Sequence, residues 1–211
     1  MLRTTLFTLI LWLPSILCSQ VLVGASGGIN RTAMSGDAPS GATYTSQFGF
    51  SASAVIDFPL GDDIRLSLQP GYARVGTGIA VTSVFRESYD SLAISLSYVS
   101  IPLLARVISN NGVTFATGGL QGGFLLNASA DPASGGPSTE LTNALASFDL
   151  AIVIGLGAQL PLSTSTATIE LRYMQSLLNL GSTDAAATAF GVPPRFRLSG
   201  LQFVAGILFS L

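Results

Sequence analysis

Histidine and lysine are absent from the 211-residue sequence, and cysteine occurs once, at Cys18. Histidine is the side chain most often used as a general base and metal ligand, and the cysteine thiolate is a common nucleophile. This scarcity excludes mechanisms of the Ser-His-Asp and Cys-His types and zinc sites built on histidine or cysteine. We therefore predict no catalytic residues, no cofactor and no metal site.

Charge is also scarce. Charged residues make up 9% of the chain and hydrophobic residues 48%, with a mean hydropathy of +0.58, whereas a soluble domain carries about 25% charged residues. So few charges cannot cover a surface that faces water on all sides, so part of this protein must face another medium. The net charge of -2, with no basic run, excludes nucleic acid as an expected partner.

Long hydrophobic runs are missing outside the N-terminal segment. No such run reaches the roughly 20 residues that a membrane-spanning helix needs. The 23 glycines and ten prolines also disfavour long helices, because glycine costs about 1 kcal/mol relative to alanine inside a helix. The sequence thus excludes an ordinary helical membrane protein.

The N-terminus has the pattern of a secretory signal peptide. Arg3 supplies the positive charge, residues 6–13 are almost wholly apolar, and the small Ser19 precedes a polar residue. We predict a signal peptide at residues 1–19 and a mature domain at residues 20–211.

Two other interpretations of the N-terminus fit less well. A lipoprotein acylated at Cys18 would need a small residue where Leu17 stands. An uncleaved anchor helix would be interrupted by Pro14 and would be too short to span a membrane.

The mature chain alternates between apolar and polar residues, as strands with two different faces do. The clearest case is residues 167–173, where Ile169, Leu171 and Tyr173 share one face while Glu170 and Arg172 share the other. Eight such segments are predicted, within residues 20–30, 47–58, 64–69, 92–98, 113–127, 148–159, 167–173 and 196–211.

Short and long connections alternate between these segments. The short ones are residues 59–62, 109–112 and 161–164, and the long ones are about residues 31–45, 81–90, 128–143 and 181–195. This order predicts an all-β fold, an eight-stranded antiparallel up-and-down transmembrane β-barrel in the bacterial outer membrane. A soluble lipocalin-like barrel or a sandwich has no reason to alternate in this way.

The charged strand residues lie opposite the large apolar side chains. An eight-stranded barrel is only wide enough for side chains to fill it, so we expect a plug of paired charges and no open pore. The predicted lumen network is Asp57, Arg65, Arg106, Asp149, Glu170 and Arg172, together with Gln47, Gln69, Gln121, Gln159 and Gln202.

Aromatic residues and breaks in the alternation give two further expectations. Phe58, Tyr72, Tyr98, Phe148, Tyr173 and Phe196 are candidates for aromatic girdles at the membrane surfaces. A β-bulge is expected at Ser100–Pro102, and a second irregularity near Gly200.

The chain ends on the apolar Leu211, with the aromatic Phe209 two residues before it and Gly206 three residues before that. This ending resembles the terminal motif by which the bacterial barrel-assembly machinery recognises its clients. The resemblance implies that this machinery is a partner during biogenesis.

Residues 98–104, 118–126 and 171–173 carry a wider resemblance. The first segment is similar to an aromatic-x-x-Ile-Pro-Leu-Leu strand in the outer-membrane β-barrel domain family of Bacteroidetes-type bacteria, which includes PorT-like proteins. OmpX/OmpA-type small barrels are more distantly similar. The resemblance implies the fold and the location more firmly than an activity.

The leading functional hypothesis is a non-enzymatic outer-membrane barrel in contact with membrane lipid, acting in envelope structure or in surface binding through its loops. Alternatives are a component of a secretion or assembly machine, a small-solute channel and an outer-membrane enzyme. The enzyme would lack the histidine on which comparable barrels depend. Asp62–Asp63 and residues 131–140 lack the ligand spacing of a calcium loop.

Overall fold

The structure is a computed structural model that describes residues 21–36, 42–81, 90–132, 138–181 and 195–210. The predicted signal peptide and Leu211 lie outside these ranges. The strands are β1 (Leu22–Ser35), β2 (Ala42–Pro59), β3 (Ile64–Leu68), β4 (Gly71–Val81), β5 (Asp90–Ile108), β6 (Thr114–Pro132), β7 (Thr139–Glu140), β8 (Phe148–Pro161), β9 (Ser165–Ser176) and β10 (Arg197–Ser210), with a 3-10 turn η2 (Thr142–Ala144).

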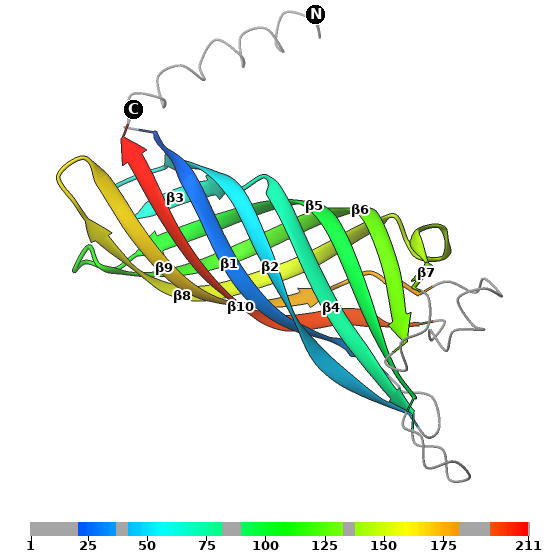
Figure 1. The fold of residues 1–211 in the computed structure, drawn as a ribbon. Helices are drawn as coiled ribbons and strands as arrows, with labels where there is room; N and C mark the ends of the chain where they lie inside the picture. The colour runs from blue at the N-terminus through cyan, green and yellow to red at the C-terminus, as the bar shows by residue number, and fades with distance from the viewer. Residues whose placement is uncertain (1–20, 37–41, 82–89, 133–137, 182–194, 211) are drawn as a thin grey trace, which may run out of the picture.

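The strands form one antiparallel sheet that closes on itself (Figure 1). Strands β1 and β10 pair along their whole length, from Leu22 with Ser210 to Ser35 with Arg197. Strands β3 and β4 lie end to end between β2 and β5, and β7 pairs only with β6. The described residues thus form a ring of eight strand courses, which confirms the predicted barrel.

The break between β3 and β4 falls at Gln69 and Pro70. Proline has no N–H to donate to a ladder, but its carbonyl still accepts a hydrogen bond from the Ala54 amide at 3.0 Å. The Gln69 amide donates to the Pro102 carbonyl, also at 3.0 Å. Both neighbouring strands therefore stay attached across the interruption.

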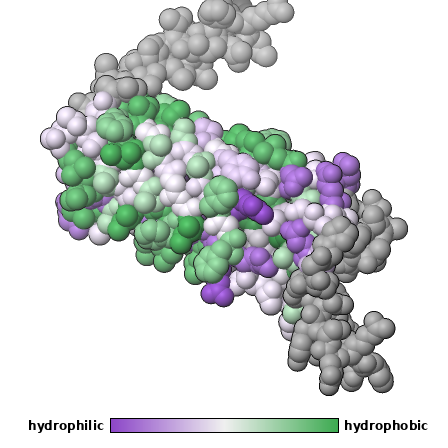
Figure 2. Space-filling model, viewed as in Figure 1, coloured by the Kyte–Doolittle hydropathy of each residue, from purple (hydrophilic) through white to green (hydrophobic). Residues whose placement is uncertain are grey.

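The outer wall is apolar because every second residue of each strand points outward. On β8, Ile154 and Leu156 are 55% and 71% exposed, while Asp149 on the opposite face is buried. Figure 2 shows hydrophobic side chains over much of the half nearer the described chain ends, with hydrophilic ones gathered toward the opposite half. A surface of this kind suits lipid and would be a liability in water.

The two ends of the barrel differ. The turns after β2, β5 and β8 are short and lie at the end where β1 begins and β10 ends, here called the inner end (Figure 1). The four longer connections lie at the outer end. No helix among the described residues is long and apolar enough to cross a membrane.

Several strands extend further than predicted. Strand β1 runs to Ser35, β2 begins at Ala42 and β6 runs to Pro132, so much of residues 31–45 and 128–143 is strand. Glycine, serine and threonine there suggested loops. They pair nonetheless, because the ladder satisfies each backbone group; Arg31 and Thr32, for example, pair with Phe48 and Gln47. The predicted connections 81–90 and 181–195 fall mostly outside the described residues.

The predicted bulge at Ser100–Pro102 is wrong. The register between β5 and β6 shifts between Ser97 and Tyr98, where Leu126 is an extra residue on β6. Strand β5 keeps one alternation throughout, with Leu96 and Leu104 both buried. The prediction failed because it placed all large apolar side chains on the lipid face, whereas those of residues 94–98 point inward.

The irregularity predicted near Gly200 is also absent. Strand β10 pairs with β1 and β9 without a shift past that residue. Its even-numbered residues face the lumen, so Leu198, Val204 and Leu208 are buried apolar side chains inside the barrel.

Candidate functional site in the barrel lumen

The six charged residues predicted for the lumen lie on inward-facing positions of β2, β3, β5, β8 and β9. Five of them are almost completely buried, and Arg65 is half-buried. Four of them form a linked group, and Arg65 and Asp149 lie outside it.

Arg106 on β5 is the centre of the linked group. Its guanidinium donates to Asp57 Oδ2 on β2 at 2.6 Å and lies 3.8 Å from Glu170 Oε2 on β9. The same guanidinium carbon lies 4.5 Å from the centre of the Phe115 ring, a distance suited to a cation–π contact. Arg106 therefore connects β2, β6 and β9 through the middle of the barrel.

Glu170 is shared by several donors. Arg172 donates two hydrogen bonds to it, from Nε to Oε1 at 2.8 Å and from Nη2 to Oε2 at 2.9 Å. The Thr117 hydroxyl on β6 donates to Oε1 as well. Such paired, hydrogen-bonded charges are the form in which ionised groups are tolerated away from water.

Arg65 and Asp149 are less closely tied to the others. Arg65 stands opposite Arg106 in the β3–β5 ladder, and its buried Nη1 has no hydrogen-bond partner among the described residues. Asp149 accepts a hydrogen bond from the Ser176 hydroxyl at 2.6 Å and makes no ion pair within the described part of the chain. The structure therefore does not bring Asp149 into the arginine network.

Four of the five predicted glutamines also bond inside the barrel. Gln69 donates to Ser67 Oγ at 2.8 Å and Gln202 to Ser51 Oγ at 2.8 Å. Gln159 donates to the Gly112 carbonyl at 2.9 Å, and Gln121 lies 3.5 Å from the Met174 sulfur. These contacts hold the four glutamine side chains inside the barrel.

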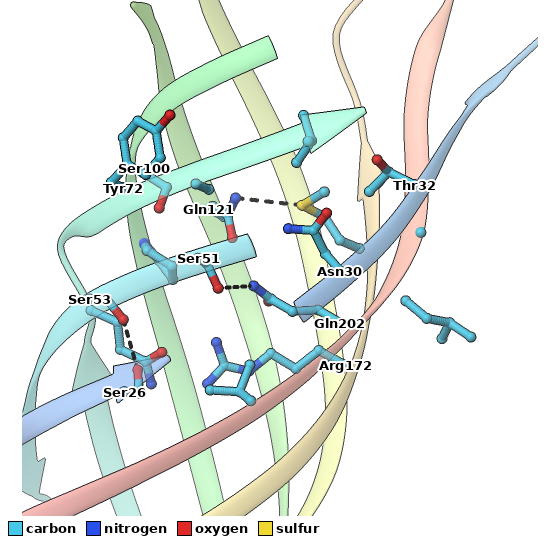
Figure 3. Close-up of a pocket in the computed structure, with 18 residues that line it drawn as sticks. Ser26, Asn30, Thr32, Ser51, Ser53, Tyr72, Ser100, Gln121, Arg172 and Gln202 are labelled. Carbon is cyan, nitrogen blue, oxygen red and sulfur yellow. Dashed lines mark hydrogen bonds between the residues drawn. The ribbon is translucent and has the colours of Figure 1, made fainter. Parts of the chain in front are cut away.

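A small polar cavity remains beside the network. Its volume is about 30 Å³, measured as the space open to the centres of water molecules. Figure 3 shows Arg172, Gln202, Ser51 and Asn30 around it. A single water needs roughly 10 to 15 Å³ on this measure. The cavity has room for about two waters and is too small for an organic solute.

An apolar core that the sequence did not predict fills the lumen toward the outer end. Its buried members come from β1, β4, β5, β6, β10 and the connections: Met34, Val75, Ile79, Ile94, Leu96, Tyr98, Ala128, Ala130, Leu141, Leu145, Leu180, Phe196 and Leu198. We call this set the outer core.

The connections supply the cover of the outer core. The Leu141 amide donates to the Ala128 carbonyl at 2.8 Å. The Ala146 amide bonds to the Leu180 carbonyl at 3.2 Å, and the Leu180 amide to the Phe196 carbonyl at 3.0 Å. The segment Leu141–Ala146, which follows β7, therefore lies across the mouth of the barrel. It is joined there by Leu180, which follows β9, and by Phe196, which precedes β10. Only the alternation of β5 could have indicated this core in advance.

The aromatic prediction is right for some residues and wrong for two. Phe148 and Tyr173 are exposed on the outer wall, and Phe148 packs on Phe124 with ring centres 5.2 Å apart. Tyr98 and Phe196 are buried in the outer core instead. Phe48 is 74% exposed on the outer wall and was not among the predicted aromatic residues.

The predicted assembly signal lies at the inner end of β10. Gly206 faces the lumen side of the wall and Phe209 is 46% exposed on the lipid side, while Leu211 falls outside the described residues. Among the described residues there is no group of three or more His, Cys, Asp or Glu side chains that could hold a metal ion.

Comparison with known proteins gives one family match. The model of the outer membrane protein beta-barrel domain matches residues 15–181. No curated protein matches the chain.

Several solved structures have a similar fold. Neisserial surface protein A is 12% identical, with 90% of this chain and 97% of that chain covered and a TM-score of 0.45. OprG from Pseudomonas aeruginosa is 9% identical, with 91% and 95% covered and a TM-score of 0.46. The attachment invasion locus protein Ail of Yersinia pestis is 15% identical, with 89% and 98% covered and a TM-score of 0.41.

Proposed function

Because the chain belongs to the outer membrane protein β-barrel domain family and is an integral protein of the bacterial outer membrane, we propose that it is a non-enzymatic barrel with a closed lumen. Its role is in envelope structure or in binding at the cell surface through its outer end. Membrane lipid and the barrel-assembly machinery are the partners expected of such a protein.

The observation that supports a closed lumen is its filling at two levels. The network of Asp57, Arg106, Glu170 and Arg172 crosses the barrel, and the outer core covers it. A channel would need a continuous polar path through the barrel. The polar cavity beside the network has a volume of only about 30 Å³. The small-solute channel is therefore the weaker candidate.

The non-enzymatic part of the proposal is supported by the residue inventory. The chain has no histidine or lysine, and the carboxylates of Asp57 and Glu170 are held by arginine in the lumen. A carboxylate bound in this way is not free to exchange protons with a substrate at the cell surface.

Conductance tests the closed lumen. The refolded chain, inserted in a planar bilayer, should give no current steps above those of the lipid. A variant that lacks residues 138–147, which supply Leu141 and Leu145 to the cover, serves as the comparison. Regular steps from the unmodified chain would contradict the proposal.

Surface binding is tested separately with whole cells. Replacing residues 133–146 by a short Gly-Ser turn leaves β6 intact, because that strand ends at Pro132. The replacement should lower attachment of cells to host-matrix or abiotic surfaces at equal barrel abundance. A control with Asp62 and Asp63 of the inner turn changed to Asn should attach normally. Equal attachment of all three strains would count against binding through the outer end.

A second candidate, a component of a secretion or assembly machine, depends on the PorT-like resemblance. The residues that carry it alternate between Ile101 and Leu103 on the lipid face and Pro102 and Leu104 on the lumen face, so they have a use in building the barrel itself. Stoichiometric partners recovered with the chain in mild detergent would favour this candidate.

A further inference from the structure

Four arginines are exposed on one sector of the barrel. Arg74 lies on β4, Arg31 on β1 and Arg197 on β10, and Arg195 immediately precedes β10. In the ring, β4, β2, β1 and β10 are consecutive neighbours. We call Arg31, Arg74, Arg195 and Arg197 the arginine sector.

The arginine sector lies toward the outer end, near the boundary of the apolar wall. Arg31 stands nine residues along β1 from Leu22. At about 3.3 Å per residue and a strand tilt near 45°, it lies roughly 21 Å above the inner end, close to the top of an apolar band about 25 Å tall. Arg197 lies further out, because it pairs with Ser35.

Aromatic side chains mark the same level. The Arg31 guanidinium lies 5.7 Å from the centre of the exposed Phe48 ring. Arg74 pairs across the ladder with Phe50, whose ring packs 5.7 Å from that of Tyr72. Aromatic residues of this kind gather where hydrocarbon meets headgroups. The guanidinium groups are therefore at headgroup height.

Among the residues that the structure describes, these positive charges have no negative partners. All ion pairs within the described residues lie in the lumen. Serine hydroxyls orient two of the side chains: Arg31 Nε donates to Ser46 Oγ at 2.7 Å and Arg74 Nη2 to Ser95 Oγ at 3.3 Å. The other donors of these two guanidinium groups have no hydrogen-bond partner in the described part of the chain.

The exposed acidic residues in the described ranges lie elsewhere. Asp62 and Asp63 are in an inner turn, and Asp131 and Glu140 are on β6 and β7. Strands β1, β2, β4 and β10 carry no acidic side chain on the outer wall, since Asp57 of β2 faces the lumen. Among the described side chains, the outer wall over these four strands therefore carries positive charge and no negative charge.

We propose that the arginine sector binds the phosphate groups of lipid A, the phosphorylated glycolipid of the outer leaflet. The planar guanidinium fork matches the oxygens of a phosphate and binds them in pairs. The apolar wall directly below, with Phe48 and Phe50, provides a surface for the acyl chains of the same molecule. Three of the four arginines lie on the strands of the wall, and only Arg195 lies in a connection.

The experiment measures retention of lipid A by the refolded chain in detergent, by native mass spectrometry. Wild type is compared with the triple variant R31Q/R74Q/R197Q and with D131N/E140Q, which alters charge at the same end on the other side. We expect the triple variant to bind bisphosphorylated lipid A at least about tenfold more weakly, since one charged hydrogen bond corresponds to about that factor. The control should bind like wild type.

Two further arms identify the ligand chemistry. Lipid A stripped of its phosphates should bind wild type and the triple variant equally. A triple Arg→Lys variant keeps the charge but loses the planar guanidinium fork. Its affinity for bisphosphorylated lipid A should lie between those of wild type and the triple Gln variant. The heat-dependent shift on gels confirms that each variant is folded.

Three results would overturn the proposal. The first is equal retention of bisphosphorylated lipid A by wild type and the triple Gln variant. The second is equal binding of phosphorylated and stripped lipid to wild type, which would show acyl-chain contact alone. The third is full displacement of lipid A by an equal concentration of inorganic phosphate, which would show a phosphate site that does not select lipid.

Discussion

Glu170 accepts more side-chain hydrogen bonds than any other charged residue in the described part of the lumen. Its carboxylate receives two hydrogen bonds from Arg172 and one from Thr117, and it lies 3.8 Å from Arg106. Removing one member of a buried ionic group leaves the others uncompensated, which costs far more than the intact group contributes.

Changing Glu170 to Gln tests this. The amide keeps the size of the side chain but removes the negative charge, so Arg106 keeps Asp57 as its only carboxylate and Arg172 loses the one it contacts among the described residues. We expect a loss of about 3 to 5 kcal/mol in the free energy of unfolding, measured by urea denaturation in lipid vesicles. Glu140→Gln, at an exposed position, should change it by less than about 0.5 kcal/mol. Equal effects would contradict the assigned role.

Gly157 offers a second test at this scale. A Cβ there would collide with the Phe115 ring, which itself packs on the Arg106 guanidinium. Gly157→Ala should therefore destabilise the barrel by about 1 to 3 kcal/mol, as overpacking does. Gly118 is the matched control on the neighbouring strand, because a Cβ there meets nothing within 4 Å. A Gly118→Ala variant less stable than Gly157→Ala would refute this account.

Strand β6 shows how one residue sets the faces of an element. Leu126 is the extra residue opposite the Ser97–Tyr98 step of β5. Below it odd-numbered residues such as Phe115 and Thr117 face the lumen, and above it Ala128 and Ala130 do. The β6–β8 ladder ends at Phe124, before the bulge, so the bulge leaves the register between β6 and β8 unchanged.

Deletion of single residues from β6 should therefore have opposite outcomes. Without Leu126 the ladder becomes regular and the same side chains stay inside, so the barrel should fold and keep its heat-dependent gel shift. Without Leu120, the residues on one side of the deletion must exchange their lumen-facing and lipid-facing positions. This variant should therefore give no folded band on the gel. Folding of the Leu120 deletion with a normal yield would disprove the register.

The strands whose faces differ in charge were predictable, and those with two apolar faces were not. Glu170 and Arg172 alternate with Ile169 and Leu171, so β9 could be assigned to a barrel wall from its residues. On β5, Leu96 faces the lumen and Leu103 the lipid, with nothing in their chemistry to tell them apart. The choice depends on the outer core, which is built from distant segments. The pairing of charges across the lumen was equally unpredictable, because it depends on how far neighbouring strands are shifted along one another around the barrel.

At the scale of the molecule, the interior has a polar level and an apolar level. The outer core depends on Leu141 and Leu145, which lie in a connection and not in the membrane wall. Changing both to Ala should thus loosen the cover while the ring of strands stays closed.

Cysteine labelling measures that opening. In a background with Cys18 changed to Ser, a Cys in place of the buried Ala128 is the reporter. We expect a thiol reagent added from the outer side to react with it at least about tenfold faster in the Leu141→Ala/Leu145→Ala variant, because local opening limits access. A Cys in place of the lipid-facing Leu156 should react alike in both backgrounds. Equal rates at position 128 would mean that the connection does not seal the mouth.

The span of the lumen network also bears on how the chain enters a bilayer. Its members come from β2, β5, β6 and β9, which are far apart in the sequence. A half-assembled sheet would expose Arg106 of β5 to hydrocarbon without Asp57 of β2 or Glu170 of β9, at a high cost. Only the complete ring brings Asp57, Arg106, Glu170 and Arg172 together, so we expect insertion and closure to be coupled, with no stable intermediate halfway across.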